Sequence, residues 1–135
     1  MTSITIEYQR LEGTAAAVGR AGSHTVVADR PEGKAGGMGL GFNGGQLLAL
    51  ALGGCFCNDV QYTAHEMGVE VSDLRVTVTI DLEGDPVVAK RAEMSVVCEL
   101  AGGGDAGPLI ERAKARCTVA HSLRAGLDVK IGRRT

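Results

Sequence analysis

The chain has 135 residues, of which 44% are hydrophobic and 22% charged, values typical of one folded domain spanning residues 1–135 and not of a disordered segment. Its formal net charge of −2 supplies no positive field for nucleic acid or anionic lipid. The longest apolar run, which begins at Leu47, is too short to cross a bilayer, so we expect a cytoplasmic protein.

The first third of the chain predicts a small antiparallel meander. Ser3–Leu11 alternates apolar and polar residues, and Thr14–Val18 and Thr25–Ala28 are two further short strand candidates. The residues Gly19–Gly22 between them suit a tight turn. Pro31–Gly45 is a glycine-rich loop that lacks the Lys-Ser/Thr pair of a phosphate-binding loop.

A long helix is expected to begin at Gly44 and to continue over Gln46–Met67, with Asn43 as its cap and Gly68 as its stop. Its first half, Leu47–Cys57, is apolar on every side, which predicts burial on all sides, whereas the second half should emerge toward solvent. One sheet cannot cover such a helix completely. We therefore expect a second copy of the chain to cover it, as an obligate homodimer, and the lack of Trp in the core agrees with this.

The second half of the chain predicts a hairpin, a helix and a strand. Val69–Leu82 and Arg91–Leu100 each alternate with a period of two, and Cys98 falls on the apolar face as an inert thiol. Leu109–Ala120 predicts a helix, and Leu127–Ile131 predicts a final strand. The order of elements indicates an α+β fold with antiparallel sheets around a buried central helix.

Two of the four cysteines are candidates for chemistry. Cys55 follows two glycines, which allow close approach of a ligand, and Cys117 follows Arg116, whose charge favours a thiolate. Two thiols that converge suit a redox cycle through a sulfenic acid and a disulfide. The alternative is that both cysteines are inert. Cys57 faces another side of the helix from Cys55, which indicates a packed thiol.

A zinc site is a weaker hypothesis. Cys117 and His121 are four residues apart and His65 could join them, but the sequence has no C-x-x-C pair. We therefore expect no metal. His121 either adjusts the reactivity of the Cys117 thiol or is a polar residue of the surface. The sequence has no G-x-S-x-G hydrolase motif either.

Residues 41–55, G-F-N-G-G-Q-L-L-A-L-A-L-G-G-C, resemble the pattern before the reactive cysteine of the OsmC/Ohr family. Residues 115–123, A-R-C-T-V-A-H-S-L, are similar to the segment around that family's second cysteine, and residues 126–129 match the stretch that leads into its last strand. The turn at Gly19–Gly22 is similar to the one that supplies the family's active-site arginine.

The resemblance implies an intertwined α+β homodimer that acts as a thiol-dependent peroxidase in oxidative stress defence. Cys55 would attack an organic hydroperoxide, Cys117 would resolve the sulfenic acid as a disulfide, and Arg20 would lower the thiol pKa and polarise the O–O bond. A dithiol or a lipoyl protein would be the reductant, and no cofactor is implied. The apolar residues around Cys55 favour an alkyl or fatty-acid peroxide.

The sequence departs from the family pattern at two places. Gly44 and Gly45 replace a Pro-Glu pair whose glutamate orients the arginine, and Thr118 replaces the proline after the second cysteine. The replacement at Gly44 and Gly45 motivates one alternative, a non-catalytic dimer that uses its interfacial pocket to bind a small apolar ligand. A thiol–disulfide exchange protein that acts on other proteins is a further alternative.

Overall fold

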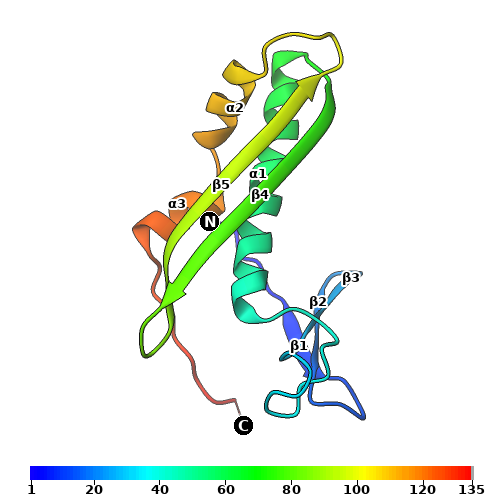
Figure 1. Ribbon diagram of the computed structural model, residues 1–135, viewed down its shortest axis with the longest axis vertical. Helices are drawn as coiled ribbons and strands as arrows, with labels where there is room; N and C mark the ends of the chain where they lie inside the picture. Colours follow the sequence, from blue (N-terminus) through cyan, green and yellow to red (C-terminus); the bar gives the residue numbers. More distant parts are fainter. Residues whose placement is uncertain (135) are drawn as a thin grey trace. The chain divides into compact units, whose positions relative to one another are not determined.

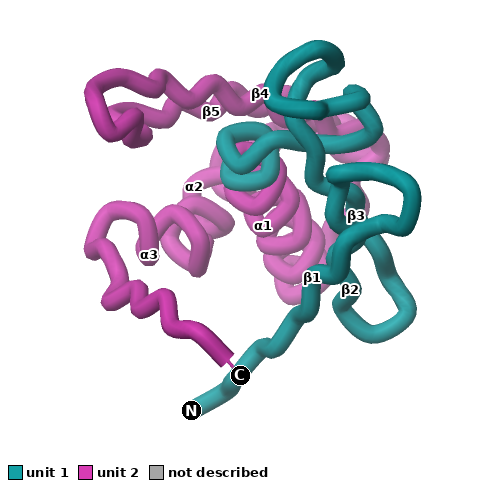
Figure 2. The backbone as a smooth tube through the Cα atoms, turned by 90° about the horizontal axis from the view of Figure 1, so that it is seen from below, with its two compact units in different colours: residues 1–48 teal, residues 49–135 magenta. Residues whose placement is uncertain are grey.

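The computed structural model describes residues 1–134, and the chain divides into two compact units, Met1–Leu48 and Ala49–Thr135 (Figure 2). The α+β class expected from the sequence is confirmed, with two antiparallel sheets and three helices among the described residues (Figure 1). Within residues 1–134 we find no helix that combines the length and apolar character needed to cross a membrane. The elements in chain order are β1 (Glu7–Arg10), β2 (Ala17–Ala21), β3 (His24–Ala28), α1 (Gly44–Met67), β4 (Val71–Glu83), β5 (Val88–Leu100), α2 (Gly107–Lys114) and α3 (Thr118–Ala125).

The N-terminal sheet has the order β1-β2-β3, with all neighbours antiparallel. The turn predicted over Gly19–Gly22 is wrong, because Gly19 and Arg20 lie inside β2 and Ala21 pairs with His24 across a two-residue loop. Gly22 has φ 61°, the left-handed conformation that so short a hairpin loop requires. Gly19 has a different role, since an added Cβ would lie 2.7 Å from the Tyr8 ring on β1.

Asp29 organises the glycine-rich loop that follows β3. Its buried carboxylate accepts hydrogen bonds from the backbone N–H groups of Arg30 (2.8 Å), Met38 (3.1 Å) and Leu40 (3.0 Å), and it also pairs with the Arg30 guanidinium. The backbone N–H groups, with that of Leu40 foremost, hold the pKa of Asp29 below its ordinary value of 3.8, although burial opposes this shift. The loop therefore has a fixed centre despite its seven glycines between residues 33 and 45.

Helix α1 begins and ends where the sequence predicts. Asn43 and Gln46 form a reciprocal capping box, in which each side chain accepts a hydrogen bond from the other residue's backbone N–H. Gly68, with φ 69°, stops the helix.

The single chain does not bury the first half of α1 on all sides, because Leu50 is 53% exposed. The expected burial on all sides depends on a second copy of the chain, so it stays a prediction. The second half does not simply emerge toward solvent, since Val60 is fully buried. The reason is that β4, β5 and α2 of the C-terminal unit cover α1 along one stripe, which continues through both halves. The buried residues of this stripe are Leu52, Gly53, Phe56, Val60, Thr63 and Ala64.

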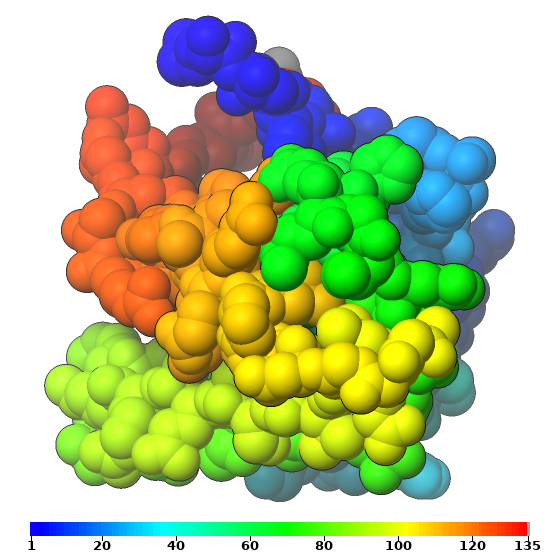
Figure 3. All heavy atoms as spheres, turned by 90° about the horizontal axis from the view of Figure 1, so that it is seen from above, coloured from blue at the N-terminus to red at the C-terminus, as the bar shows by residue number. Residues whose placement is uncertain are grey.

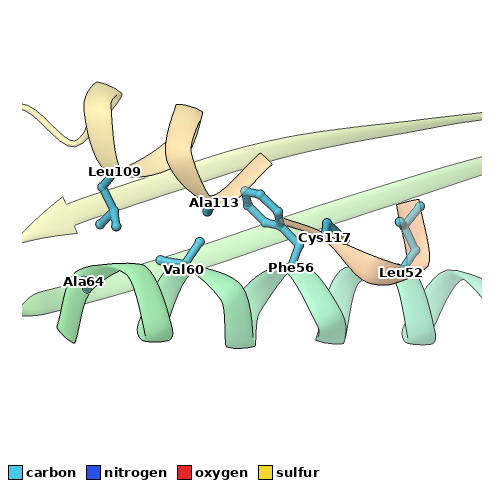
Figure 4. Close-up of a cluster of buried hydrophobic side chains, with 7 residues drawn as sticks. All are labelled: Leu52, Phe56, Val60, Ala64, Leu109, Ala113 and Cys117. Carbon is cyan, nitrogen blue, oxygen red and sulfur yellow. The ribbon is translucent and has the colours of Figure 1, made fainter. Parts of the chain in front are cut away.

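Strands β4 and β5 form the long hairpin predicted from the alternation. Leu74 pairs with Cys98 and Val78 pairs with Met94, so the apolar side chains of the two strands share the face that packs on α1 (Figure 1). The helix approaches this face closely at Gly53, where an added Cβ would lie 3.1 Å from a Val78 methyl. The core between these elements contains Leu52, Phe56, Val60, Ala64, Leu109, Ala113 and Cys117 (Figure 4).

The single helix predicted over Leu109–Ala120 is wrong, because this segment contains parts of two short helices, α2 and α3. The chain breaks between them, and Cys117 has an extended backbone (φ −66°, ψ 103°) as the residue that begins α3. In Figure 3, α2 lies against the C-terminal end of α1, as expected from their shared core.

The final strand predicted over Leu127–Ile131 is also wrong. Residues 127–131 form no strand, and Ile131 is 96% exposed. Alternation of apolar residues describes a strand only where a neighbouring strand supplies hydrogen bonds, and none within residues 1–134 pairs with this segment.

Candidate active site

Two cysteines that are 62 positions apart in the chain lie close together in the C-terminal unit. Cys55 is in the middle of α1, and Cys117 is at the break between α2 and α3. Their Sγ atoms and a carboxylate oxygen of Asp59 all lie within 4.8 Å of one another. Both cysteines are free thiols. The structure therefore brings together the two thiols that the sequence singled out.

The two thiols differ in accessibility. Cys117 is only 2% exposed and belongs to the buried cluster, in which its side chain points toward α1 beside Phe56 (Figure 4). Cys55 is half-buried and packs against the edge of the same cluster. A reagent from solvent can therefore reach Cys55 more readily than Cys117.

Burial raises the pKa of the Cys117 thiol, because the low-dielectric core disfavours the thiolate. The backbone N–H of Ala120 in the first turn of α3 opposes this rise, whereas the nearby Cys55 and Asp59 side chains add to it. The surroundings of Cys117 therefore favour the neutral thiol over the thiolate. The positive charge of the preceding Arg116 does not activate this thiol as the sequence suggested, because the Arg116 side chain points elsewhere.

Arg116 instead reaches back to α1. Its Nη1 atom lies 2.9 Å from the Glu66 carboxylate and 3.4 Å from the Thr63 hydroxyl, and its Nε atom lies 4.0 Å from Asp59. The guanidinium also lies over the ring of Tyr62, 5.7 Å from the centroid. Arg116 thus fastens the segment that carries Cys117 to the helix that carries Cys55.

Asp59 is the member of the site that sequence reasoning missed. It lies one helical turn after Cys55, and the Cys55 Sγ donates a hydrogen bond to its Oδ2 atom over 3.6 Å. The C-x-x-x-D spacing within a predicted helix was the available signal, because residues i and i+4 share one face.

The other residues singled out from the sequence lie outside this cluster. Cys57 and Cys98 are half-buried elsewhere in the same unit. The His121 Nε2 atom lies 2.8 Å from the Ala115 carbonyl oxygen, and His65 is exposed on α1. The zinc ligand set of Cys117, His121 and His65 is therefore not assembled. Arg20 is an exposed residue of β2 in the N-terminal unit.

Comparison with known proteins shows which protein family the segment around this site resembles. A family model described as OsmC-like protein matches residues 36–132, a stretch that contains both cysteines. None of the curated protein sequences matches the chain.

Three solved structures illustrate the similarity. An OsmC-like protein from Mycoplasma pneumoniae matches with a TM-score of 0.74 and 15% identity, over 91% of this chain and 88% of that one. An organic hydroperoxide resistance protein OsmC from Legionella pneumophila matches with a TM-score of 0.63 and 19% identity, over 96% and 95% of the two chains. An organic hydroperoxide resistance protein from Elizabethkingia anophelis matches with a TM-score of 0.66 and 16% identity, over 92% and 89%. At these identities the matches show the fold.

Proposed function

Because the chain belongs to the OsmC-like protein family, we propose that it is a thiol-dependent peroxidase that reduces organic hydroperoxides in defence against oxidative stress. The observation that carries the proposal is the placement of the Cys55 and Cys117 sulfur atoms within 4.8 Å of each other. A disulfide bond is about 2.05 Å long, so closing the remaining gap requires a shift of a few ångströms at most. Two solved proteins of the same fold are named for organic hydroperoxide resistance.

The proposed cycle has three steps. The Cys55 thiol attacks the terminal oxygen of the hydroperoxide, which breaks the O–O bond, releases an alcohol and leaves Cys55 as a sulfenic acid. The Cys117 thiol then attacks the Cys55 sulfur, and water leaves as the disulfide forms. A dithiol, either a small molecule or a lipoyl group on a protein, reduces the disulfide and returns both thiols.

The order of the two cysteines follows from access. The half-buried Cys55 meets the peroxide first, whereas the buried Cys117 meets only the sulfenic acid beside it. Cys117 also has the freedom that the second step needs, because it lies between two short helices and not inside one. Leu52 and Phe56, which precede and follow Cys55 on α1, add an apolar environment suited to an alkyl peroxide.

Two arginines are candidates for stabilising charge during the first step. The family resemblance assigns this role to Arg20, and we keep that assignment as part of the proposal. Arg116 is a second candidate, since it lies 4.0 Å from the carboxylate that the Cys55 thiol contacts. Replacing each arginine by glutamine and measuring kcat/KM for one hydroperoxide decides between them.

We propose further that the protein works as a homodimer in the reducing cytoplasm, where its thiols stay reduced. Support comes from apolar side chains that the single chain leaves exposed. On α1, Leu50 is 53% exposed and Tyr62 is 62% exposed, and on β5 Val97 is 53% exposed. Sedimentation of the purified protein at micromolar concentration tests this part of the proposal, and a monomer would contradict it.

The deciding experiment compares Cys55→Ser with Cys57→Ser, because both cysteines lie on α1 and are half-buried but only Cys55 belongs to the cluster. We expect Cys55→Ser to abolish consumption of cumene hydroperoxide with dihydrolipoamide as reductant, and Cys57→Ser to retain it. Turnover that survives in Cys55→Ser overturns the proposal. An insulin-reduction assay on the same samples separates a peroxidase from a thiol–disulfide exchange protein, which would reduce insulin and spare the peroxide.

A further inference from the structure

The cluster of two thiols and a carboxylate suits a second chemistry besides redox turnover. We propose that Cys55, Asp59 and Cys117 form a binding site for a divalent zinc ion, which the fully reduced protein takes up. Neither the sequence nor the family similarity points to this ligand set, since the spacing of Cys117 from the other two residues is set only by the fold. Binding itself does not depend on the peroxidase function proposed above.

The distances between the three ligand atoms fit a tetrahedral metal. With Zn–S near 2.3 Å and Zn–O near 2.1 Å, tetrahedral ligand atoms lie about 3.6–3.8 Å apart. The Cys55 Sγ lies 3.6 Å from the Asp59 Oδ2 atom, and no pair in the cluster is more than 4.8 Å apart. Side-chain rotations that move the ligand atoms by about 1 Å would therefore complete a tetrahedral zinc site.

The backbone supports the three ligands in a way that suits a metal site. Cys55 and Asp59 are one turn apart on α1, so the helix fixes both on one face, as it does in zinc-binding H-E-x-x-H helices. The third ligand, Cys117, comes from the break between α2 and α3. A bound ion would thus cross-link two segments that are far apart in sequence.

The charges of the site favour a cation. Two thiolates and one carboxylate would together carry three negative charges in a half-buried position. The guanidinium of Arg116 lies 4.0 Å from Asp59, but it also pairs at 2.9 Å with Glu66. A zinc ion balances two of these charges directly, and two sulfur ligands select it over magnesium or calcium. Three protein ligands leave the fourth position for water or a small anion.

Zinc binding releases the two thiol protons as each sulfur becomes a thiolate ligand. The same sulfurs are used in a disulfide, so a zinc-bound site and an oxidised site exclude each other. If the proposed peroxidase function holds, a hydroperoxide and two protons convert the zinc-bound dithiolate into the disulfide, an alcohol, water and a free zinc ion. Zinc would then occupy the reduced site and be released when a hydroperoxide oxidises it.

Titration of the fully reduced, metal-free protein with zinc in competition with a chromophoric chelator tests the inference. We expect one ion per chain. Loss of a residue that only orients a ligand costs about 10- to 100-fold in affinity, so Asp59→Asn should weaken binding by at least about tenfold. The matched control is Cys57→Ser, which should bind as the unaltered protein does. Circular dichroism checks that each variant is folded.

Cobalt provides a second measurement that does not depend on a substitution. Cobalt added to the reduced protein should give the thiolate charge-transfer and visible bands of a tetrahedral site, and prior oxidation to the Cys55–Cys117 disulfide should abolish them. Equal zinc affinity in the unaltered protein and Asp59→Asn, or cobalt spectra without thiolate bands, overturns the inference. Intact zinc binding in a protein whose reduced, metal-free form consumes no peroxide would instead reject the proposed function and leave the metal site standing.

Discussion

The Cys55 thiol donates a hydrogen bond to Asp59, whose Oδ2 atom lies 3.6 Å from the sulfur one turn further along α1. The immediate polar neighbour of the proposed attacking thiol is therefore a carboxylate. Arg116 then contacts this carboxylate from the segment that precedes Cys117. The two halves of the candidate site are thus connected by a chain of polar contacts as well as by the packing of the core.

Replacing Cys117 by serine should stop the cycle after its first step. The Cys55 sulfenic acid would form at an unchanged rate, but it would persist because no resolving thiol lies beside it. Dimedone trapping and mass spectrometry should detect one adduct, on Cys55, after a single equivalent of hydroperoxide. Cys98→Ser, which removes a half-buried thiol of β5, is the control and should form the disulfide normally. Multiple turnovers by Cys117→Ser at the original rate would contradict this prediction.

Replacing Arg116 by glutamine should slow disulfide formation more than it affects stability. Its side chain is 37% exposed and its partner Glu66 is 51% exposed, so the ion pair should contribute no more than about 1 kcal/mol to the free energy of unfolding. Loss of the contacts to Glu66 and Asp59 would nevertheless release the Cys117 segment from α1.

Quenched-flow mass spectrometry after one equivalent of hydroperoxide measures the rate of disulfide formation in this variant. Arg112→Gln, at an exposed arginine of α2, is the matched control and should resolve at the unaltered rate. Equal rates in the two variants would mean that Arg116 does not position Cys117.

Asp29 should make the glycine-rich loop sensitive to acid. Its pKa in the folded chain is below the ordinary value of 3.8, so its ionised form contributes stability that is fully present above the unfolded value and is lost as pH falls through the folded value. The Met38 and Leu40 amides donate to this carboxylate, so their protection from hydrogen exchange, relative to the intrinsic exchange rate at each pH, should fall across that range.

In the variant Asp29→Asn these two amides should exchange rapidly already at neutral pH. The NH₂ group of asparagine cannot accept the hydrogen bonds that one carboxylate oxygen of Asp29 accepts from both of them. The variant should also lose the acid dependence. An acid dependence that persists in Asp29→Asn would show that another group is responsible.

Replacing Gly41 by alanine should unfold the end of the same loop. A Cβ at this position would collide with the backbone carbonyl of Val27, at the place where Phe42 bridges to Ala28. Such overpacking lowers the free energy of unfolding by about 1–3 kcal/mol. Limited proteolysis should then cut within residues 30–42 much faster than in the unaltered protein.

Gly44→Ala is the control, because an added Cβ there has nothing within 4 Å and alanine favours the first turn of α1. Equal proteolysis of the two variants would refute the proposed collision.

The sequence predicted those features that depend on local rules. Asn43 and Gly68 bound α1 because capping and stopping are decided by the residues themselves. The β4–β5 hairpin followed from strict alternation, which only a half-covered sheet face requires.

The features that could not be predicted depend on contacts between distant segments. The break before α3 separates residues that look like one amphipathic helix, and Leu127–Ile131 has the pattern of a strand but no partner within residues 1–134. Asp59 was missed because it belongs to the site only through its proximity to Cys117, which comes from a distant part of the chain.

The interruption between α2 and α3 also determines which part of the molecule can report its chemical state. Cys55 lies in the middle of α1, a helix of 24 residues, whereas Cys117 lies at a break between two short helices. We therefore expect the movement that disulfide formation requires to occur on the side of Cys117. Helix α3, only eight residues long and with no fully buried residue, would be pulled or released accordingly. The redox state of the two sulfur atoms would in this way change the position of an exposed helix, and the reductant could recognise this change at the protein surface.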